Sequence, residues 1–355
     1  MLVVGAGGIG GITAAGLAEL GVPVVCVTGR EDIARVLNER GARVREAEGE
    51  RVARGLRAFA TLPGGEGPFS FVLLAVQPPQ VEEAARAAAP HLAEQGRMVC
   101  FQNGLCEQRI AGIVGEQRAL GAVVGWGASQ LAPGDYERTA AGGFTLGYLD
   151  GRIDAPVERL GRLLECVGPV EISTNLLGAR WSKLAINCAI STIGTLGGER
   201  LGPLVRHRVV RRLALELMTE VVEVARAEGV KLQKVSGTLD LDWMALTEAE
   251  RFSVGSASLV AKHGMLLAVG ARFRRMRSSM LAAIERGRMP AVDYLNGEVV
   301  ERGRRHRIAT PVNLQAQRMV HEIASGKRSS SMATIHALHE ATSAVRGKQE
   351  QDVVD

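Results

Sequence analysis

A lysine and an asparagine four residues apart are the first candidates for a chemical role. Lys183 and Asn187 belong to the run Trp181-Ser182-Lys183-Leu184-Ala185-Ile186-Asn187-Cys188, and this spacing places both on one face of a helix. An ammonium group can donate a proton and can stabilise negative charge that develops on a bound molecule. A lysine exposed to solvent is the alternative, which the tryptophan and the apolar neighbours disfavour.

Two further polar segments carry residues that could bind a substrate. Asn103-Gly104 follows an apolar run at residues 97–101, and the carboxyl ends of strands are where ligands bind in open α/β sheets. Later in the chain, polar residues interrupt an apolar helical pattern at Ser278-Ser279-Met280, at Gly287-Arg288 and at Asp293-Tyr294-Leu295-Asn296-Gly297. These segments are therefore candidates for the walls of a polar binding site.

The sequence Gly5-Ala6-Gly7-Gly8-Ile9-Gly10 matches the dinucleotide-binding pattern G-x-G-x-x-G. It follows an apolar strand and precedes a helix, where the glycines allow a tight turn, a close approach of the pyrophosphate and close packing of helix on strand. The N-terminus of that helix supplies free N–H groups and a partial positive charge. A glycine-rich turn without a ligand is the alternative. The position favours a dinucleotide site at Gly5, Gly7, Gly8, Ile9 and Gly10.

The end of the second strand distinguishes NADP from NAD. An NAD site presents Asp or Glu there to the ribose 2′-hydroxyl, whereas Val27-Thr28-Gly29-Arg30 has no carboxylate and places Arg30 to meet a 2′-phosphate. Glu31 follows directly and weakens the assignment, and a solvated loop charge is the alternative for Arg30. NADP(H) is the predicted cofactor.

The first half of the chain alternates short apolar runs with helical stretches, which is typical of α/β proteins with a doubly wound parallel sheet. The expected strands are Leu2–Val4, Val22–Val27, Phe71–Val76, Arg97–Phe101, Ala119–Ser129, Gly143–Tyr148 and Pro169–Ser173. The expected helices end near Leu20 or span Asp32–Arg40, Val81–Glu94 and Pro156–Gly168. We therefore predict an N-terminal Rossmann-type domain over residues 1–174.

From about Asn175 onward, helical periodicity replaces the strand signals. Long amphipathic patterns cover Arg206–Glu228 and Pro311–Ile323, with Gly229 as a natural stop for the first and Pro311 as a natural start for the second. We predict an all-α C-terminal domain over residues 175–346. The polar segment 347–355 is expected to be a frayed tail.

Composition excludes several classes of protein. The chain has 355 residues, of which 46% are hydrophobic and 23% charged, so disorder is not expected. Its apolar runs are shorter than the roughly 18–20 residues that span a bilayer, and its first residues lack the basic segment of a secretory signal. Five cysteines without a C-x-x-C pair predict reduced thiols in a cytoplasmic protein and no metal site. The net charge of +5 is spread over many arginines, and no nucleic-acid-binding motif is present.

Taken together and in this order, these motifs resemble those of the ketopantoate reductase family (2-dehydropantoate 2-reductase) over nearly the whole chain. The resemblance rests on GAGGIG, on Asn103-Gly104, on W-x-K-L-x-x-N-C and on S-S-M…G-R…D-Y-x-N-G. It implies that NADPH reduces a 2-oxo acid in a cleft between the two domains. It also implies a cytoplasmic homodimer that forms through the helical domain.

The resemblance implies a role for several single residues. Lys183 corresponds to the catalytic lysine that protonates the ketone oxygen as hydride arrives at C2, and Asn103 corresponds to an asparagine near the nicotinamide and substrate. The other corresponding positions are the substrate-binding residues Asn187, Ser191, Ser279 and Asn296 and the cofactor-side residues Gln77 and Gln80. For Ser279 and Asn187, a capping or core hydrogen-bond role is the alternative.

The sequence departs from the family at positions that matter for specificity. Ala291 and Ala283 stand where the family usually has carboxylates, Ser191 replaces a second asparagine and Gln77 replaces a lysine. Losing an acceptor for a substrate hydroxyl should relax or redirect specificity. The predicted substrate is therefore 2-dehydropantoate or a related 2-oxo acid. There are two alternatives. The protein reduces a different ketone or imine, or it is a non-catalytic NADP-binding module.

An additional segment, roughly Thr238 to Arg277, lengthens the chain relative to compact family members. It holds several of the few aromatic residues and a basic run, namely Trp243, Phe252 and Phe273 with Arg272, Arg274, Arg275 and Arg277. One interpretation is a helical insertion with a solvated basic face. The other is a wall of an altered substrate pocket, in which Arg277 attracts a carboxylate beside Ser279.

Overall fold

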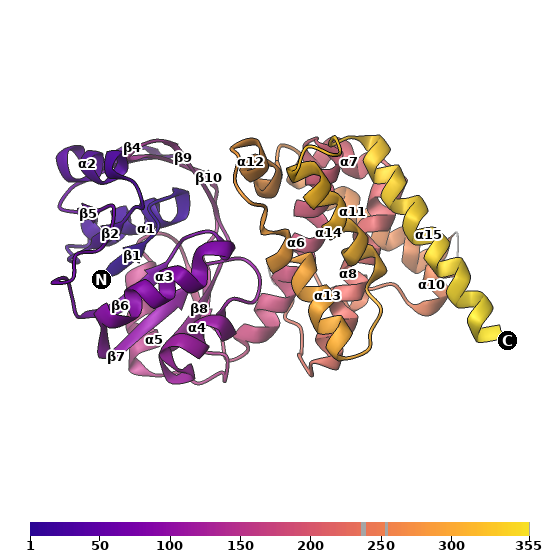
Figure 1. Cartoon of the computed structure of the whole chain (residues 1–355), viewed down its shortest axis with the longest axis horizontal. Helices are drawn as coiled ribbons and strands as arrows, with labels where there is room; N and C mark the ends of the chain where they lie inside the picture. Colours follow the sequence, from indigo (N-terminus) through magenta and orange to yellow (C-terminus); the bar gives the residue numbers. More distant parts are fainter. Residues whose placement is uncertain (236–238, 253–254, 355) are drawn as a thin grey trace. The chain divides into compact units, whose positions relative to one another are not determined.

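The computed structural model describes residues 1–235, 239–252 and 255–354. The chain divides into two compact units, Met1–Leu176 and Leu177–Asp355 (Figure 1). The first unit is α/β with a mostly parallel sheet and the second is helical, which confirms the predicted fold class. Thr238 and Asp355, where the expected insertion begins and the expected tail ends, lie outside the described residues.

The core of the first unit is an eight-stranded sheet. Its strands, in spatial order, are β12 (Val170–Ile172), β11 (Phe144–Gly147), β8 (Ala119–Val124), β7 (Leu92–Cys100), β6 (Phe69–Leu74), β1 (Leu2–Val4), β2 (Val25–Val27) and β5 (Arg57–Phe59). Neighbouring strands are parallel except β8 and β11, which are antiparallel. The central strands are runs of Val, Leu and Cys because both faces of the sheet are covered.

Helices connect the parallel strands of this sheet. They are α1 (Gly8–Glu19), α2 (Glu31–Arg40), α3 (Val81–Ala88), α4 (Glu107–Val114) and α5 (Ala155–Leu164), with short 3₁₀ turns η1 (Pro78–Gln80), η2 (Ala89–His91) and η3 (Glu116–Arg118). The strand order reverses at β1, since β2 and β5 follow on one side and β6, β7 and β8 on the other. The carboxyl ends of β1 and β6 therefore meet at the switch point where such folds bind ligands.

A second, four-stranded sheet was not expected from the sequence. It consists of β4 (Gly49–Ala53), β3 (Ala42–Glu46), β10 (Asp135–Ala140) and β9 (Gly127–Ala132), in that order. The prediction of one strand over Ala119–Ser129 is therefore wrong, because β8 ends at Val124 and β9 belongs to the other sheet. Strand β3 alternates apolar and charged residues and β4 contains Glu50 and Arg51, so both lack the continuous apolar run by which the central strands were recognised.

Two predicted helices differ from the observed ones at one end. Helix α3 stops at Ala88 rather than Glu94, because Pro90 falls in the turn η2 and β7 begins at Leu92. A proline offers no N–H to continue the helical ladder. The predicted helix over Arg206–Glu228 begins instead at Arg208, since His207 is extended.

The second unit consists of helices throughout its described residues. They are α6 (Leu176–Gly197), α7 (Leu201–Arg206), α8 (Arg208–Ala227), α9 (Leu241–Met244), α10 (Glu248–Phe252), α11 (Ala257–Arg272), α12 (Ser279–Glu285), η4 (Ala291–Tyr294), α13 (Asn296–Arg305), α14 (Pro311–Ala324) and α15 (Met332–Val354). Gly229, with φ of +71°, follows the end of α8, and Pro311 opens α14, as the sequence predicts. Helix α15 extends into the segment for which a frayed tail was expected. Within the described residues, no helix combines the length and the apolar character needed to cross a bilayer.

Candidate functional site

The glycine-rich loop lies directly at the carboxyl ends of β1 and β6. Gly5 has φ of +101°, its N–H donates to the carbonyl of Val27 (2.8 Å), and a Cβ on it would come within 2.8 Å of the backbone of Ala75. A Cβ on Gly10 would lie 1.9 Å from the carbonyl oxygen of Gly5. Both positions therefore exclude any side chain.

Gly7 differs from its neighbours because it faces open space. Apart from its neighbours in the chain, no atom of the described residues lies within 4 Å of where its Cβ would be, and Gly7 is the N-cap of α1 without a side-chain capping bond. The first turn of α1 contains no acidic residue. The N–H groups of that turn, which begins at Gly8 and Ile9, are thus open to an anion, as a pyrophosphate site requires.

The small sheet supports this loop from one side. A Cβ on Gly8 would lie 2.7 Å from the backbone of Ala128 in β9, and one on Gly11 would lie 2.2 Å from the ring of Tyr136 in β10. The Tyr136 hydroxyl donates to the carbonyl of Ala6 (3.1 Å). Sequence reasoning missed this support; its only signal was Gly11, an extra glycine just after the motif.

Arg30 lies at the end of β2, as N-cap of α2, and its side chain is exposed. Its guanidinium donates to Asp32 through Nε (2.9 Å to Oδ1) and through a second contact to Oδ2. This hydrogen bond and the charge of Arg30 hold the pKa of Asp32 below its usual value. Asp32 is therefore a carboxylate beside the predicted phosphate-binding arginine, and the sequence motif did not reveal it.

Asn103 follows β7 and is half-buried at the same edge of the sheet as the glycine-rich loop. The adjacent Gln102 is buried and fixes this edge, because its Nε2 donates to the carbonyls of Leu74 (2.9 Å) and Val76 (3.0 Å) beyond β6. Gln77 and Gln80 are exposed on either side of Pro78 and Pro79 at the same end of β6. The first unit therefore brings its predicted cofactor-side residues to neighbouring strand ends.

In the helical unit, α6 carries three of the predicted residues in one stripe. Lys183, Asn187 and Ser191 follow one another at intervals of four and are all half-buried. The Nδ2 atom of Asn187 is buried and has no hydrogen-bond partner among the described residues. An amide donor in this state is suited to binding a ligand oxygen.

The neighbours of Lys183 anchor the helix rather than line this stripe. Trp181 is fully buried, with the guanidinium of Arg302 5.7 Å from its ring centre. The hydroxyl of Ser182 donates to the carbonyl of Gln233 (2.6 Å) and accepts from its N–H (3.1 Å). The tryptophan of the W-x-K motif thus has a packing role in this unit.

The two serines of the S-S-M segment have different environments. Ser278 is buried and caps α12, where its Oγ accepts from the N–H of Leu281 (3.2 Å) and donates to the carbonyl of Ser191 (2.8 Å). Ser279 is exposed as the first residue of α12. The capping role that was the alternative for Ser279 is thus filled by Ser278.

Asn296 is completely buried, and protein groups engage both ends of its side-chain amide. Its Oδ1 accepts from Thr192 (2.6 Å), and its Nδ2 donates to Asn313 (2.9 Å) and to the carbonyl of Cys188 (3.4 Å). Asn296 is therefore not available to a substrate in this conformation, in contrast to the sequence-based expectation.

The positions that lack the family's carboxylates are half-buried. Ala291 opens η4 and Ala283 lies in α12. Arg277, which one of the two interpretations assigned to a substrate carboxylate, pairs with Glu285 (2.5 Å) and is exposed. Within the expected insertion, buried Lys262 forms an ion pair with Glu250.

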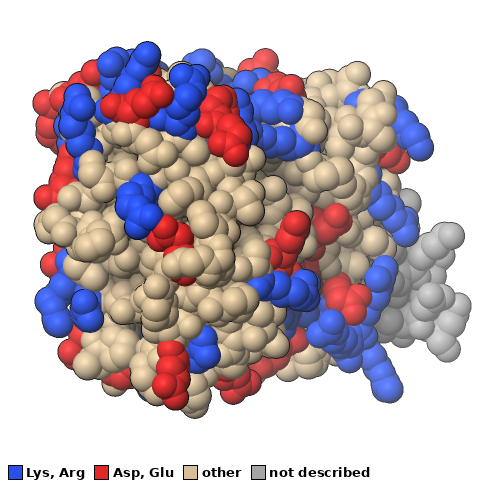
Figure 2. All heavy atoms as spheres, turned by 60° about the vertical axis from the view of Figure 1, so that its left-hand side comes forward, with Lys and Arg blue, Asp and Glu red and all other residues tan. Residues whose placement is uncertain are grey.

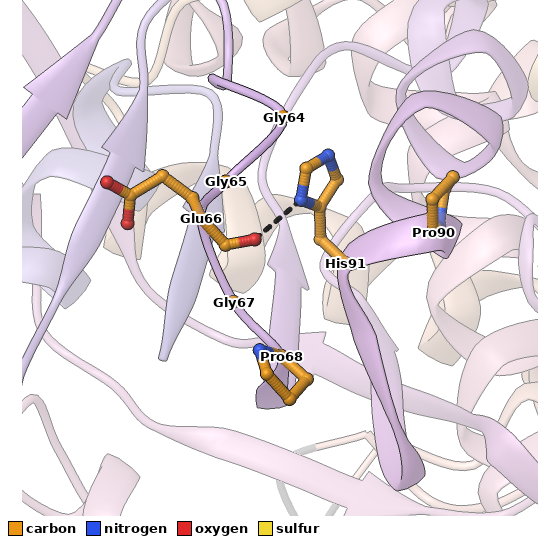
Figure 3. Close-up of a pocket in the computed structure, with 7 residues that line it drawn as sticks. All are labelled: Gly64, Gly65, Glu66, Gly67, Pro68, Pro90 and His91. Carbon is orange, nitrogen blue, oxygen red and sulfur yellow. Dashed lines mark hydrogen bonds between the residues drawn. The ribbon is translucent and has the colours of Figure 1, made fainter.

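The surface shows two other features. A hollow lined by Gly64, Gly65, Glu66, Gly67, Pro68, Pro90 and His91 lies beside the starts of β6 and β7, where His91 Nδ1 is 2.7 Å from the carbonyl oxygen of Glu66 (Figure 3). It contains none of the predicted site residues and lies at the amino ends of the strands, opposite to the ligand-binding edge. Acidic and basic side chains are interspersed on the face shown in Figure 2. The described residues include no group of three or more His, Cys, Asp or Glu side chains arranged to hold a metal ion.

Comparison with known proteins identifies the same family in both units. The family model described as ketopantoate reductase PanE/ApbA matches residues 1–151, and the one described as its C terminal part matches residues 175–324. The 2-dehydropantoate 2-reductase of Pyrococcus abyssi is 25% identical over 314 residues, which are 88% of this chain and 93% of that protein.

Solved structures show the same fold. The PanE/ApbA family ketopantoate reductase of Ralstonia eutropha JMP134 superimposes with a TM-score of 0.75 at 25% identity, covering 92% of this chain and 99% of that one. A ternary structure of D-mandelate dehydrogenase with NADH and anilino(oxo)acetate superimposes with a TM-score of 0.74 at 17% identity, covering 95% and 99%. These findings confirm the resemblance seen in the motifs. The chain belongs to the ketopantoate reductase family of oxidoreductases.

Proposed function

We propose that the protein is an NADPH-dependent reductase that converts a 2-oxo acid to the 2-hydroxy acid, with Lys183 as general acid. The observation that carries the proposal is the half-buried stripe on α6, where Lys183 lies one helical turn from Asn187, whose Nδ2 has no hydrogen-bond partner in the part of the chain that the structure describes. A carboxylic acid with an adjacent carbonyl offers acceptors for both groups. The family membership of the chain supports the reaction class.

The α/β unit has the features that a nicotinamide dinucleotide requires. Gly5 and Gly10 allow the loop to close on β1, Gly7 leaves room for a pyrophosphate, and α1 presents free N–H groups to it. Asn103, Gln77 and Gln80 flank the same edge of the sheet. Arg30 would bind the 2′-phosphate of NADP(H) after its guanidinium has released its hydrogen bond to Asp32.

A nicotinamide cofactor held by the glycine-rich loop would supply the hydride that reduces C2 of the substrate. Lys183 Nζ donates a proton to the carbonyl oxygen, so that the carbonyl becomes a hydroxyl and the lysine is left neutral until solvent reprotonates it. Asn187 Nδ2 donates a hydrogen bond to a substrate oxygen, and Ser191 and Ser279 provide hydroxyls for the carboxylate. Asn103 orients the nicotinamide and the substrate.

The substrate we propose is 2-dehydropantoate or a related 2-oxo acid with a branched apolar side chain. Ala291 and Ala283 cannot accept a hydrogen bond from a substrate hydroxyl through their side chains. D-mandelate dehydrogenase, which shares the fold, was solved with anilino(oxo)acetate, a 2-oxo acid with an aromatic substituent. A branched apolar acid would suit a site in which apolar groups replace carboxylates.

The test is NADPH oxidation over a panel of 2-oxo acids, ketones and imines that includes 2-dehydropantoate and a branched apolar 2-oxo acid. We expect turnover on at least one 2-oxo acid and a loss of about a hundredfold or more in Lys183→Ala, the scale of a positioned general acid, with NADPH affinity retained. Lys327→Ala, which removes an exposed lysine of the same unit, is the control. NADPH binding without turnover on any substrate would instead indicate a non-catalytic module.

We also infer that the protein is a cytoplasmic homodimer in which α11 packs against α11 of a second copy. Every exposed residue of α11 between Ser258 and Arg272 is apolar or small, namely Val260, Ala261, Gly264, Met265, Leu267, Ala268 and Ala271. Val260 is 68% exposed and Met265 is 40% exposed. A helix that is apolar on its outer face as well as its inner face is expected to be covered.

Charge at the two ends of α11 favours a second copy in antiparallel orientation. The C-terminal end carries exposed arginines at Arg272, Arg274 and Arg275, whereas Glu248 is exposed on α10. The Lys262–Glu250 ion pair joins α10 to the first half of α11. A two-fold axis through Gly264 and Met265 would therefore bring these arginines towards Glu248 of the second copy and align the helix dipoles favourably.

A further inference from the structure

A chain of buried side-chain hydrogen bonds begins on the inner face of α6. Asn296, the first residue of α13, receives a hydrogen bond from Thr192 Oγ1 (2.6 Å) and donates one to the carbonyl of Cys188 (3.4 Å). Both contacts are to α6, one helical turn apart. Asn296 therefore fixes α6 at two successive turns through a single side chain with 0% exposure.

The chain continues to a buried carboxylate on α8. Asn296 Nδ2 donates to Asn313 Oδ1 (2.9 Å), and Asn313 Nδ2 donates to Glu220 (2.7 Å). Glu220 also accepts the backbone N–H groups of Val312 (2.8 Å) and Asn313 (2.9 Å), in the first turn of α14. The carboxylate thereby caps α14 and holds Asn313 in position to bind Asn296.

The residues that this network holds are adjacent to those of the reactive stripe. Cys188 directly follows Asn187, and Thr192 directly follows Ser191. Because successive residues of an α-helix are about 100° apart, the anchored positions lie roughly 100° around α6 from Asn187 and Ser191. A rotation of α6 that weakened the contacts of Asn296 would move Lys183 and Asn187 by a similar angle.

We propose that Thr192, Asn296, Asn313 and Glu220 form a positioning network that sets the rotation of α6 and thereby aims Lys183 and Asn187 at the substrate. This inference rests on the proposed function, since it assigns the network to proton donation by Lys183. The four residues act through α6 and touch no substrate. They lie on four helices, α6, α13, α14 and α8, so the position of one helix is set by three others.

The sharpest variant is Thr192→Val, which keeps the branched shape and removes only the hydroxyl bonded to Asn296. A misplaced catalytic group loses rate steeply with small displacements, so we expect kcat to fall about tenfold. KM and NADPH affinity should change by less than about twofold, and the solvent isotope effect on kcat should rise because proton donation has become slower. Thr192→Ser, which retains the hydroxyl, should restore kcat to within about threefold of wild type.

Thr219→Val is the matched control for the loss of a buried threonine hydroxyl. Thr219 lies on α8, is buried, and donates to the carbonyl of Leu215 (2.6 Å) while accepting from the N–H of Leu246 (2.8 Å), outside the network. We expect it to lower the melting temperature as Thr192→Val does and to leave kcat and the solvent isotope effect unchanged.

The outcomes separate this inference from the function on which it rests. Turnover that depends on Lys183, combined with a kcat of Thr192→Val equal to that of Thr219→Val, would overturn the positioning network alone. Turnover that does not depend on Lys183 would overturn the proposed function and the network together. A loss in Thr192→Val that Thr192→Ser does not restore would also contradict the network, because the hydroxyl would then not be the group that matters.

Discussion

The carbonyl oxygen of Gly5 occupies the space that a Cβ on Gly10 would need, at a distance of only 1.9 Å. At Gly7, two residues after Gly5, no atom of the described residues other than those of its chain neighbours lies within 4 Å of the Cβ site. The motif therefore contains two kinds of glycine. The fold of the loop requires glycine at Gly5 and Gly10. At Gly7 the protein itself leaves room for a side chain, so glycine there serves the close approach of a bound ligand.

Alanine substitutions should separate these two roles. Gly10→Ala should destabilise the α/β unit by roughly 1–3 kcal/mol, the usual cost of overpacking, and abolish cofactor binding. Gly7→Ala should leave the melting temperature of the protein alone unchanged, since the new methyl group meets no protein atom and φ is −75°. Its affinity for NADPH should nevertheless fall by about tenfold or more.

Thermal melting without cofactor and fluorescence titration with NADPH measure the two effects. Equal affinity of Gly7→Ala and wild type would show that the pyrophosphate does not approach this glycine. A marked loss of stability in Gly7→Ala would contradict the open surroundings of its Cβ site.

The pairing of Arg30 with Asp32 makes a prediction about cofactor preference. Arg30→Ala should lower the affinity for NADPH much more than the affinity for NADH, because only NADPH carries the 2′-phosphate that the guanidinium would bind. Asp32→Asn should act in the opposite direction and strengthen NADPH binding, since it removes a carboxylate that competes for Arg30 and repels a phosphate. Both effects should shrink at high salt because the side chains are exposed.

Dissociation constants for NADPH and NADH, measured for the same preparation of each variant, test this prediction. If Arg30→Ala lowered the affinities for NADPH and NADH by the same factor, the assignment to NADP(H) would be wrong. NADH binding that exceeds NADPH binding in the wild type would assign Asp32, rather than Arg30, to the adenine ribose.

The outer face of α11 predicts the effect of a charge placed at its centre. Met265→Glu should convert a dimer to a monomer, because the partner would bury an unpaired carboxylate. Leu20→Glu, at a more exposed apolar position in the α/β unit, should leave the dimer intact. Light scattering after size-exclusion chromatography measures both. A wild-type monomer, or a Met265→Glu dimer, would exclude α11 as the interface.

The sequence allowed prediction of the parts of the fold that rest on local chemistry. Apolar runs such as Val3, Val72 and Val99 identified the buried central strands, and the glycine pattern located the turn after β1. Strands β3 and β4 escaped prediction because their charged residues face solvent, so no long apolar run marks them. The position of β3 depends on its pairing with β10, which lies about ninety residues later in the chain, and the position of β4 depends on its pairing with β3.

The candidate site was predictable only where a residue's role is set by its own segment. The spacing of Lys183 and Asn187 was enough to place them on one face of α6. The assignment of Asn296 to the substrate could not anticipate that Thr192 and Asn313, distant in sequence, engage its amide. Likewise, the choice between Ser278 and Ser279 as helix cap depends on where α12 begins, which side-chain periodicity does not resolve.

Glu220 gives the helical unit a characteristic dependence on pH. Burial raises the pKa of its carboxyl group to about 7, against the effect of the hydrogen bonds from Asn313 and Val312, which lower it. The folded state therefore binds a proton at Glu220 more tightly than the unfolded state, whose glutamate has a pKa near 4.3. The stabilisation is complete below the unfolded value and is lost as the pH rises through about 7.

From this proton affinity we expect Glu220 to reduce the free energy of unfolding by about 2 kcal/mol between pH 5.5 and pH 8, since each pKa unit corresponds to about 1.4 kcal/mol.

Glu220→Gln should remove this part of the pH dependence. It should also destabilise the protein at every pH, because an amide donor would face the N–H groups of Val312 and Asn313. Glu298→Gln, which removes another buried carboxylate that accepts from Arg302 (2.8 Å), is the control for the general destabilisation. Urea unfolding at several pH values measures the differences. A Glu220→Gln profile parallel to that of the wild type would show that this carboxylate is ionised throughout the range, and α14 would then be capped by a full negative charge.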